Sequence, residues 1–321
     1  MSDRIDTQNP HSPRPPVSDG APSPWHAGEI RLQQILGVDA RMEEVGRKVL
    51  RDHLIEQHRL FYPQLPFVVL GSVDPDGRPW ATLRANKPGF LFATDIYHLA
   101  VTLPRDGNDP ADAGMEDGDA IGLLGIELHT RRRNRLNGTI SRTNETSFDI
   151  TVGHSFGNCP KYITPRDLDI ARHSAPASAT IARGEHDLSN DARALIARSD
   201  TFFIASYIDH DDQRRDVDVS HRGGNPGFVH IEDDGTLIIP DYAGNRFFNT
   251  LGNLLINPRA GLVFVDFTNG DMLQITGNAE IIMGGAMLEN YEGAERLVAF
   301  RPSQWIHRPG AFPLRMTGAN G

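Results

Sequence analysis

The chain contains a single cysteine, Cys159, among its 321 residues. One cysteine excludes an internal disulfide and any metal site built from several thiolates. No apolar run approaches the roughly 18–20 residues that a membrane-spanning helix requires, and the N-terminus lacks the apolar core of a signal peptide. We therefore expect a cytoplasmic protein with no membrane partner.

Basic residues are scarce relative to acidic ones, because 32 Lys and Arg face 42 Asp and Glu, for a formal net charge of −10. Nucleic acids and anionic membranes are themselves negative, so wholesale binding to either is not expected. The expected partners are a small-molecule substrate or a redox partner. Whether the chain forms a homo-oligomer stays open.

The pattern of apolar residues divides the chain into four segments. Residues 1–28 are rich in Pro, Ser and Asp and predict a disordered tail. Residues 29–165 predict a helical lead-in followed by a first set of short Val-, Ile- and Leu-rich strands. Residues 166–200 predict a linker with one helix, and residues 201–321 a second set of strands. The fold class expected is all-β with flanking helices.

The two β-rich halves repeat each other, which predicts a duplicated domain. The spacing between matching segments drifts slowly and never reverses. Two related small barrels in one chain would imitate a symmetric dimer of single barrels. The matching segments are Phe67–Val69 with Phe202–Ile204, Arg84–Phe90 with Arg222–Phe228, and Arg135–Gly138 with Gln274–Gly277.

The second half contains a candidate phosphate clamp within residues 216–258. A Gly-rich loop precedes the predicted strands 228–231 and 236–240, and a predicted helix over residues 246–255 follows them. Adjacent glycines, a helix start and arginines are all suited to holding phosphate. A hairpin with surface arginines is the alternative. The predicted cofactor-binding residues are Ser220, His221, Arg222, Gly223, Gly224, Asn245, Arg246 and Asn249.

The first half keeps Arg84 but not the rest of this pattern. Ala85 and Asn86 replace the two glycines, and an acidic insertion over residues 104–119, expected to be a mobile loop, replaces the second arginine. The second half is therefore the expected cofactor-binding barrel. The first half would supply the opposite wall of the cofactor site. Arg84 would then either pack within its own half or reach across the interface into that site.

Two first-half segments are candidates for that wall. Residues 131–135 read RRRNR, and four like charges repel unless an anion compensates them or the hairpin tip is solvated. Residues 156–163 contain Cys159, for which a buried structural role is the alternative to a role in the wall.

As an ordered set, DVSHRGGNPGFV, a strand ending in IP, GNR and LxNxLxNP closely resemble the pyridoxamine 5′-phosphate oxidase-like flavin-binding proteins. More narrowly, they resemble the predicted flavin-nucleotide-binding branch of that superfamily. The resemblance covers most of residues 45–315. It implies two tandem FMN-binding split β-barrels that form a pseudo-dimer, with FMN at their interface.

The resemblance also implies a function, an FMN-dependent oxidoreductase of unknown substrate. No catalytic residue is assigned, because a flavin can carry the redox chemistry itself. Some relatives are fused to a reductase module that this chain lacks, so a separate reductase is a further expected partner. The alternatives are a non-catalytic flavin-binding or sensing module, or a split barrel adapted to haem or a deazaflavin.

A hydrolase-like motif occurs at residues 153–157, which read GHSFG and match G-x-S-x-G. The nucleophile elbow that carries this motif needs a strand, a sharp turn and then a helix. Asn158-Cys159-Pro160 follows directly, and no helical pattern develops. We therefore expect the match at Ser155 to be accidental.

Overall fold

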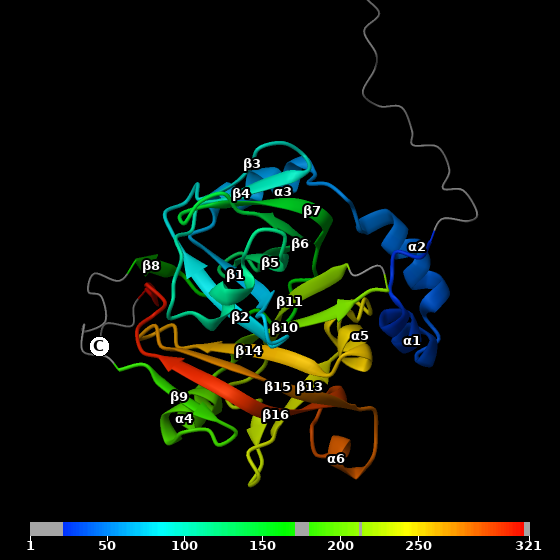
Figure 1. Cartoon of the computed structure of the whole chain (residues 1–321). Helices are drawn as coiled ribbons and strands as arrows, with labels where there is room; N and C mark the ends of the chain where they lie inside the picture. Colours follow the sequence, from blue (N-terminus) through cyan, green and yellow to red (C-terminus); the bar gives the residue numbers. More distant parts are fainter. Residues whose placement is uncertain (1–21, 171–179, 212–213, 318–321) are drawn as a thin grey trace, which may run out of the picture.

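The computed structural model describes residues 22–170, 180–211 and 214–317 of the chain. The body of the structure consists of two antiparallel sheets that lie against each other (Figure 1). The strands of the first sheet are β1 (Phe67–Val73), β2 (Pro79–Ala85), β3 (Leu91–Ala93), β4 (His98–Val101), β5 (Ala120–Glu127), β6 (Arg132–Ser141) and β7 (Phe148–Gly157). The strands of the second are β10 (Thr201–Asp209), β11 (Arg215–Gly223), β12 (His230–Ile231), β13 (Leu237–Tyr242), β14 (Arg259–Val265), β15 (Met272–Ile282) and β16 (Ala294–Arg308).

The two sheets have the same topology. The strand order is β2-β1-β5-β6-β7-β4-β3 in the first and β11-β10-β14-β15-β16-β13-β12 in the second. A bulge interrupts the ladder at the same place in both, before Gly138 on β6 and before Gly277 on β15. The predicted fold, all-β with two tandem split barrels, is therefore confirmed.

The ladders correct one detail of the predicted repeat. Val68 lies opposite Arg84 on β2, and Phe202 lies opposite Arg222 on β11. Val68, rather than Phe67, is therefore the counterpart of Phe202. Both segments are apolar throughout, so their sequences alone leave a slip of one residue unresolved.

The two barrels pack back to back through β1, β2, β5, β10, β11 and β14. Each barrel has its own apolar core, and a third core joins side chains of both, including Val69, Leu83, Val219 and Val263. This shared core explains why β1 and β10 are almost continuously apolar, since both of their faces are covered. A Cβ on Gly71 would come within 3.1 Å of the Ala205 and Val219 side chains, so this glycine permits the close approach.

Helices surround the sheets and close the ends of the barrels. No helix in the described ranges is both long and apolar enough to cross a membrane. The α-helices are α1 (Ala27–Ile35), α2 (Asp39–Val49), α3 (Glu56–Phe61), α4 (Asn190–Arg198), α5 (Asn249–Ile256) and α6 (Ala286–Glu289). The 3-10 helices are η1 (Tyr62–Gln64) and η2 (Pro110–Gly114).

Two predicted segments differ from the structure. Of the predicted tail, residues 1–28, only residues 22–28 belong to the described residues. Trp25 is buried, donates to the Met42 carbonyl at 2.9 Å and packs on Phe247, which anchors this segment. The predicted linker contains strands besides α4, for β8 (Leu168–Ile170) pairs with β17 (Leu314–Met316) and β9 (Ala182–Glu185) extends the second sheet. Residues 171–179 of this linker lie outside the described ranges.

Candidate functional site

A polar pocket lies where the second barrel meets β6 and β7 of the first. The second barrel contributes side chains from β11, β13, the loop before α5 and the first turn of α5. The first barrel contributes both predicted wall segments. Lining residues from the first barrel are Arg133, Arg135, Asn158, Cys159, Lys161 and Tyr162.

All of the predicted cofactor-binding residues except Gly224 line this pocket. The segments predicted to form the site therefore lie together around one pocket, but two of them differ in conformation from the prediction. Ser220–Gly224 is not a loop, because β11 continues through Gly223. The predicted helix also begins later than Arg246, at Asn249, since Arg246 and Phe248 adopt left-handed backbone angles (φ 66° and 65°).

The two adjacent glycines do not form a phosphate nest. Gly223 pairs with Thr201 in the sheet, and the Gly224 N–H donates to the Asp200 carbonyl at 3.0 Å. A Cβ on Gly223 would overlap the Tyr162 carbonyl, and one on Gly224 would press on the Phe228 ring. These glycines permit close packing, and their N–H groups are not gathered for an anion.

The two predicted clamp arginines are each paired with a carboxylate. Arg222 lies 2.6 Å from Asp241, and Arg246 forms a two-pronged pair with Glu295, both contacts at 2.7 Å. The buried Arg296 bridges the same two carboxylates. Because these pairs hold the guanidinium groups, the prediction that Arg222 and Arg246 converge on one anion does not describe this arrangement.

Arg135 extends from the first barrel into the interface. It contacts the Ser220 hydroxyl, donates to the Asn249 side-chain oxygen at 3.0 Å and lies 3.9 Å from Asp218. Burial lowers the pKa of Arg135 to about 10, and Asp218 opposes that shift. A guanidinium whose pKa lies near 10 remains charged at neutral pH, so Arg135 brings positive charge from the first barrel to the second.

The Arg131–Arg135 segment is divided between solvent and the pocket. Arg131 and Arg132 are exposed, as the hairpin-tip alternative predicts. Arg133 turns inward and donates to the Cys159 carbonyl, with its Nε at 2.9 Å. Burial lowers the pKa of Arg133 to about 10, and the neighbouring Arg135 adds to the shift.

Several buried polar atoms around the pocket have no hydrogen-bond partner among the described residues. They are the Nε of Arg135, the Nδ2 of Asn158 and both ring nitrogens of His221. Burial lowers the pKa of His221 well below its ordinary value, and three nearby arginines lower it further, so its ring is neutral. Unpartnered buried donors are costly, and an anion or a polar ligand would satisfy them.

The start of α5 borders the same pocket. Asn249, Thr250 and Leu251 line it, and the Thr250 hydroxyl lies 2.7 Å from that of Ser220. The helix has no side-chain cap on its first turn among the described residues. The partial positive charge of a helix start therefore adds to the charge of Arg135.

The pseudo-symmetric counterpart of this pocket has different residues, two from each barrel. The ladders align Thr82 with Ser220 and Arg84 with Arg222. They likewise align Gln274 with Arg135. Counting one residue beyond β7 aligns Asn158 with Arg308 at the end of β16.

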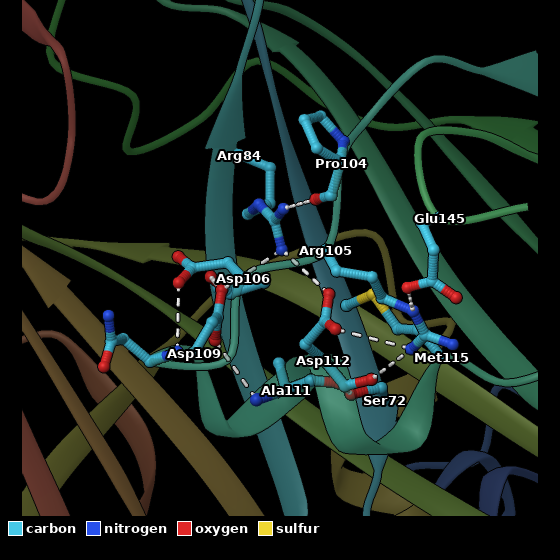
Figure 2. Close-up of polar contacts among 12 residues, drawn as sticks. Ser72, Arg84, Pro104, Arg105, Asp106, Asp109, Ala111, Asp112, Met115 and Glu145 are labelled. Atoms are coloured by element: carbon cyan, nitrogen blue, oxygen red, sulfur yellow. Dashed lines mark hydrogen bonds and ion pairs between the residues drawn. The ribbon is translucent and has the colours of Figure 1, made fainter.

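The acidic insertion is packed at this first-barrel position, contrary to the expected mobile loop. It contains η2, and Ala111 and Met115 are buried in the first core. Figure 2 shows the Arg84 side chain directed at Asp112, 3.3 Å away, and at the Pro104 carbonyl. Arg84 therefore pairs within its own barrel and does not reach across to the pocket.

Ser155 is not placed as a nucleophile. Strand β7 runs through the whole GHSFG motif, so no strand–turn–helix elbow exists there. Ser155 is fully buried, and its hydroxyl lies 2.9 Å from the Nδ1 of His58. Burial lowers the pKa of His58 to about 4, which makes this a neutral structural pair.

The fold and the pocket together define a tandem split-barrel protein with one arginine-rich site at the barrel interface. Within this class, residues 188–308 match the family model for pyridoxamine 5′-phosphate oxidase. The family resemblance predicted from the sequence is therefore confirmed for the second barrel. No curated protein sequence matches the chain significantly.

Several solved structures are similar to parts of the chain. HupZ from Group A Streptococcus is 15% identical, with a TM-score of 0.31, over 40% of this chain and 98% of HupZ. An FMN-binding protein from Syntrophomonas wolfei is 13% identical, with a TM-score of 0.24, over 36% of this chain and 86% of its own. HutZ, a heme storage protein from Vibrio cholerae, is 13% identical, with a TM-score of 0.27, over 37% of this chain and 93% of its own.

Proposed function

We propose that the chain binds FMN in the interface pocket and acts as a flavin-dependent oxidoreductase. The observation that carries the proposal is the pair of buried, unpartnered donors on Arg135 and Asn158. The residues aligned with them, Gln274 and Arg308, both contact the carboxylate of Asp109. A phosphate monoester is the anion that FMN would bring to these donors. Arg135, Asn158, Ser220 and Arg222 are the residues that would hold it.

The chemistry of the pocket fits a phosphate. Its lining includes six cationic side chains and the buried carboxylate of Asp241. Positive charge in excess of negative charge, within a partly buried site, favours a doubly charged anion. The six are Arg133, Arg135, Lys161, Arg222, Arg246 and Arg296.

The size of the pocket also bears on how a nucleotide would bind. Its cavity volume is about 110 Å³, less than the roughly 300–1,000 Å³ of pockets that enclose a whole cofactor. The phosphate end fits such a volume. Accommodating the rest of FMN would require the ion pairs Arg222–Asp241 and Arg246–Glu295 to open, or part of the ligand to lie outside the pocket.

The chain's own residues would bind and orient the cofactor, and FMN would supply the electron transfer. We assign no residue as acid or base. The neutral imidazole of His221 can offer one donor and one acceptor to a bound ligand without adding charge. The expected electron donor is a separate redox partner or reductase.

Titration of the apoprotein with FMN, followed by flavin fluorescence, tests the proposal. Riboflavin, which lacks the phosphate, is the matched control ligand. FMN should bind and riboflavin should bind at least about 10-fold more weakly, because a charge-assisted contact contributes on the order of 1.5–3 kcal/mol. Equal affinities, or no binding of FMN, would contradict the phosphate site.

Two further observations separate the proposal from its alternatives. If the purified protein shows the absorption bands of haem, or contains a deazaflavin, then that group and not FMN is the cofactor. Turnover of reduced nicotinamide with an added electron acceptor would distinguish an oxidoreductase from a flavin carrier or sensor. If flavin is bound but no turnover occurs, the protein is a flavin-binding module and the proposed oxidoreductase activity is wrong.

A further inference from the structure

The first barrel contains an oxyanion site that the chain itself fills. At this site Thr82, Arg84, Gln274 and Arg308 stand where Ser220, Arg222, Arg135 and Asn158 stand at the interface pocket. All four donors converge on one side chain, the carboxylate of Asp109. That carboxylate has no solvent-exposed surface.

The contacts of Asp109 are those of a bound anion. Its Oδ2 accepts from the Thr82 hydroxyl at 2.6 Å and lies 3.4 Å from Arg308 and 3.6 Å from Arg84. Its Oδ1 accepts from the Gln274 amide at 2.8 Å and from the Ala111 N–H at 3.1 Å. Two cations and three neutral donors therefore surround the Asp109 carboxylate, and the same two cations also pair with Asp112 and Asp106.

The donors come from both barrels, so the site depends on the duplication. Thr82 and Arg84 lie on β2 of the first barrel, whereas Gln274 and Arg308 lie on β15 and β16 of the second. This is the same exchange seen at the interface pocket, where Arg135 and Asn158 of the first barrel face Ser220 and Arg222. The Nε of Arg308 is buried without a partner among the described residues, as the Nε of Arg135 is.

We propose that Asp109 is a tethered anion that closes a latent oxyanion site, whose ligand class is inorganic phosphate or the phosphate end of a monoester. The acidic insertion contributes this carboxylate from the residue directly before η2. A tethered group acts at an effective concentration of about the millimolar range or more, so it excludes free phosphate without a change in the surrounding donors. The proposal depends on the pseudo-symmetry of the donors and not on whether FMN binds elsewhere.

Two substitutions at one position test it. Asp109→Ala removes the carboxylate and leaves its space, while Asp109→Asn removes the charge and keeps the space filled. Inorganic phosphate, compared with chloride at equal ionic strength, should raise the melting temperature of the alanine variant by about 5 °C more than that of the asparagine variant or the wild type. The asparagine variant controls for the general stabilising effect of phosphate salts.

Calorimetric titration with phosphate gives a second readout. Phosphate that enters the interface pocket would bind all three proteins alike, so the expected result is one additional phosphate per chain in the alanine variant. Asp112→Ala is a further control, because Asp112 pairs with Arg84 and Arg105 but has no contact with Thr82 or Gln274 among the described residues. It should lose stability without gaining a phosphate.

If Asp109→Ala does not fold in chloride, its refolding yield in phosphate relative to that of Asp109→Asn replaces the melting temperature. A selective gain in yield for the alanine variant supports the tethered anion. Equal responses of all variants, or no recovery of the alanine variant in phosphate, would overturn it. Failure of FMN binding, measured separately, would leave this result unaffected.

Discussion

Arg84 and Arg222 occupy equivalent positions on β2 and β11, yet they meet carboxylates that come from different places. Arg222 pairs with Asp241 on β13, at the edge of an open pocket. Arg84 pairs with Asp112 and lies near Asp109 (Figure 2), both from the acidic segment between β4 and β5, whereas α5 lies in the equivalent connection between β13 and β14. The duplicated barrels thus share an arrangement of hydrogen-bond donors. The Asp109 carboxylate fills one of the two sites, and the other site is open.

The first prediction concerns Arg135. Replacing it with alanine should weaken FMN binding by about 10- to 150-fold, because one charge-assisted contact contributes about 1.5–3 kcal/mol. Fluorescence titration of the apoprotein gives the affinity. Arg131→Gly is the matched control, since it removes one charge from the same hairpin at an exposed position whose φ of 59° glycine tolerates. Equal losses in the two variants would indicate a general charge effect rather than a contact.

The second prediction concerns Glu29, whose carboxylate accepts from the Asn249 amide at 2.6 Å. Burial raises the pKa of Glu29 to about 8, and the charge of Asp218 adds to the shift. Between its ordinary pKa of 4.5 and about 8, the folded chain keeps a proton that the unfolded chain has lost. The free energy of unfolding should therefore fall as pH rises through this window, by up to about 5 kcal/mol.

Glu29→Gln cannot lose a proton, so its stability should fall less between about pH 5 and pH 8 than that of the wild type. Urea denaturation at several pH values measures the difference. Glu44→Gln, at an exposed site on α2, should keep the wild-type slope. Parallel profiles for Glu29→Gln and the wild type would show that Glu29 is ionised in the folded chain throughout this range.

The third prediction concerns Ser155. Alanine at this position leaves the buried Nδ1 of His58 without its partner, which should lower the free energy of unfolding by about 1–3 kcal/mol. FMN content and any redox turnover should stay at the wild-type level, because Ser155 does not line the pocket. Labelling of Ser155 in the wild type by a fluorophosphonate would show that it is an accessible nucleophile after all.

Much of the fold could be predicted because the duplicated halves repeat the same pattern of strands and turns in the sequence. The match of Arg84–Phe90 with Arg222–Phe228 located two equivalent hairpins, and the apolar runs around Phe67 and Phe202 located the strands that both barrels bury. Local sequence also identified α5, although the left-handed residues Arg246 and Phe248 delay its start.

The details of the pocket depend on contacts between distant segments, which local patterns do not carry. A Gly-Gly pair fits an anion nest or close packing equally well, and only the approach of the Tyr162 carbonyl decides for packing. The run RRRNR does not reveal that Arg135 faces inward while Arg131 faces solvent. The sequence did not single out Asp109 within the acidic insertion, because one of its cations, Arg308, belongs to the other barrel.

The number of flavins per chain tests the central claim most directly. We propose one open site at the barrel interface and a second site closed by Asp109. Releasing the cofactor from FMN-saturated, desalted protein by denaturation, and measuring FMN per mole of chain, should give a ratio near one. A ratio near two would show that the first barrel also binds the cofactor, and would contradict both the assignment of a single site and the role of Asp109.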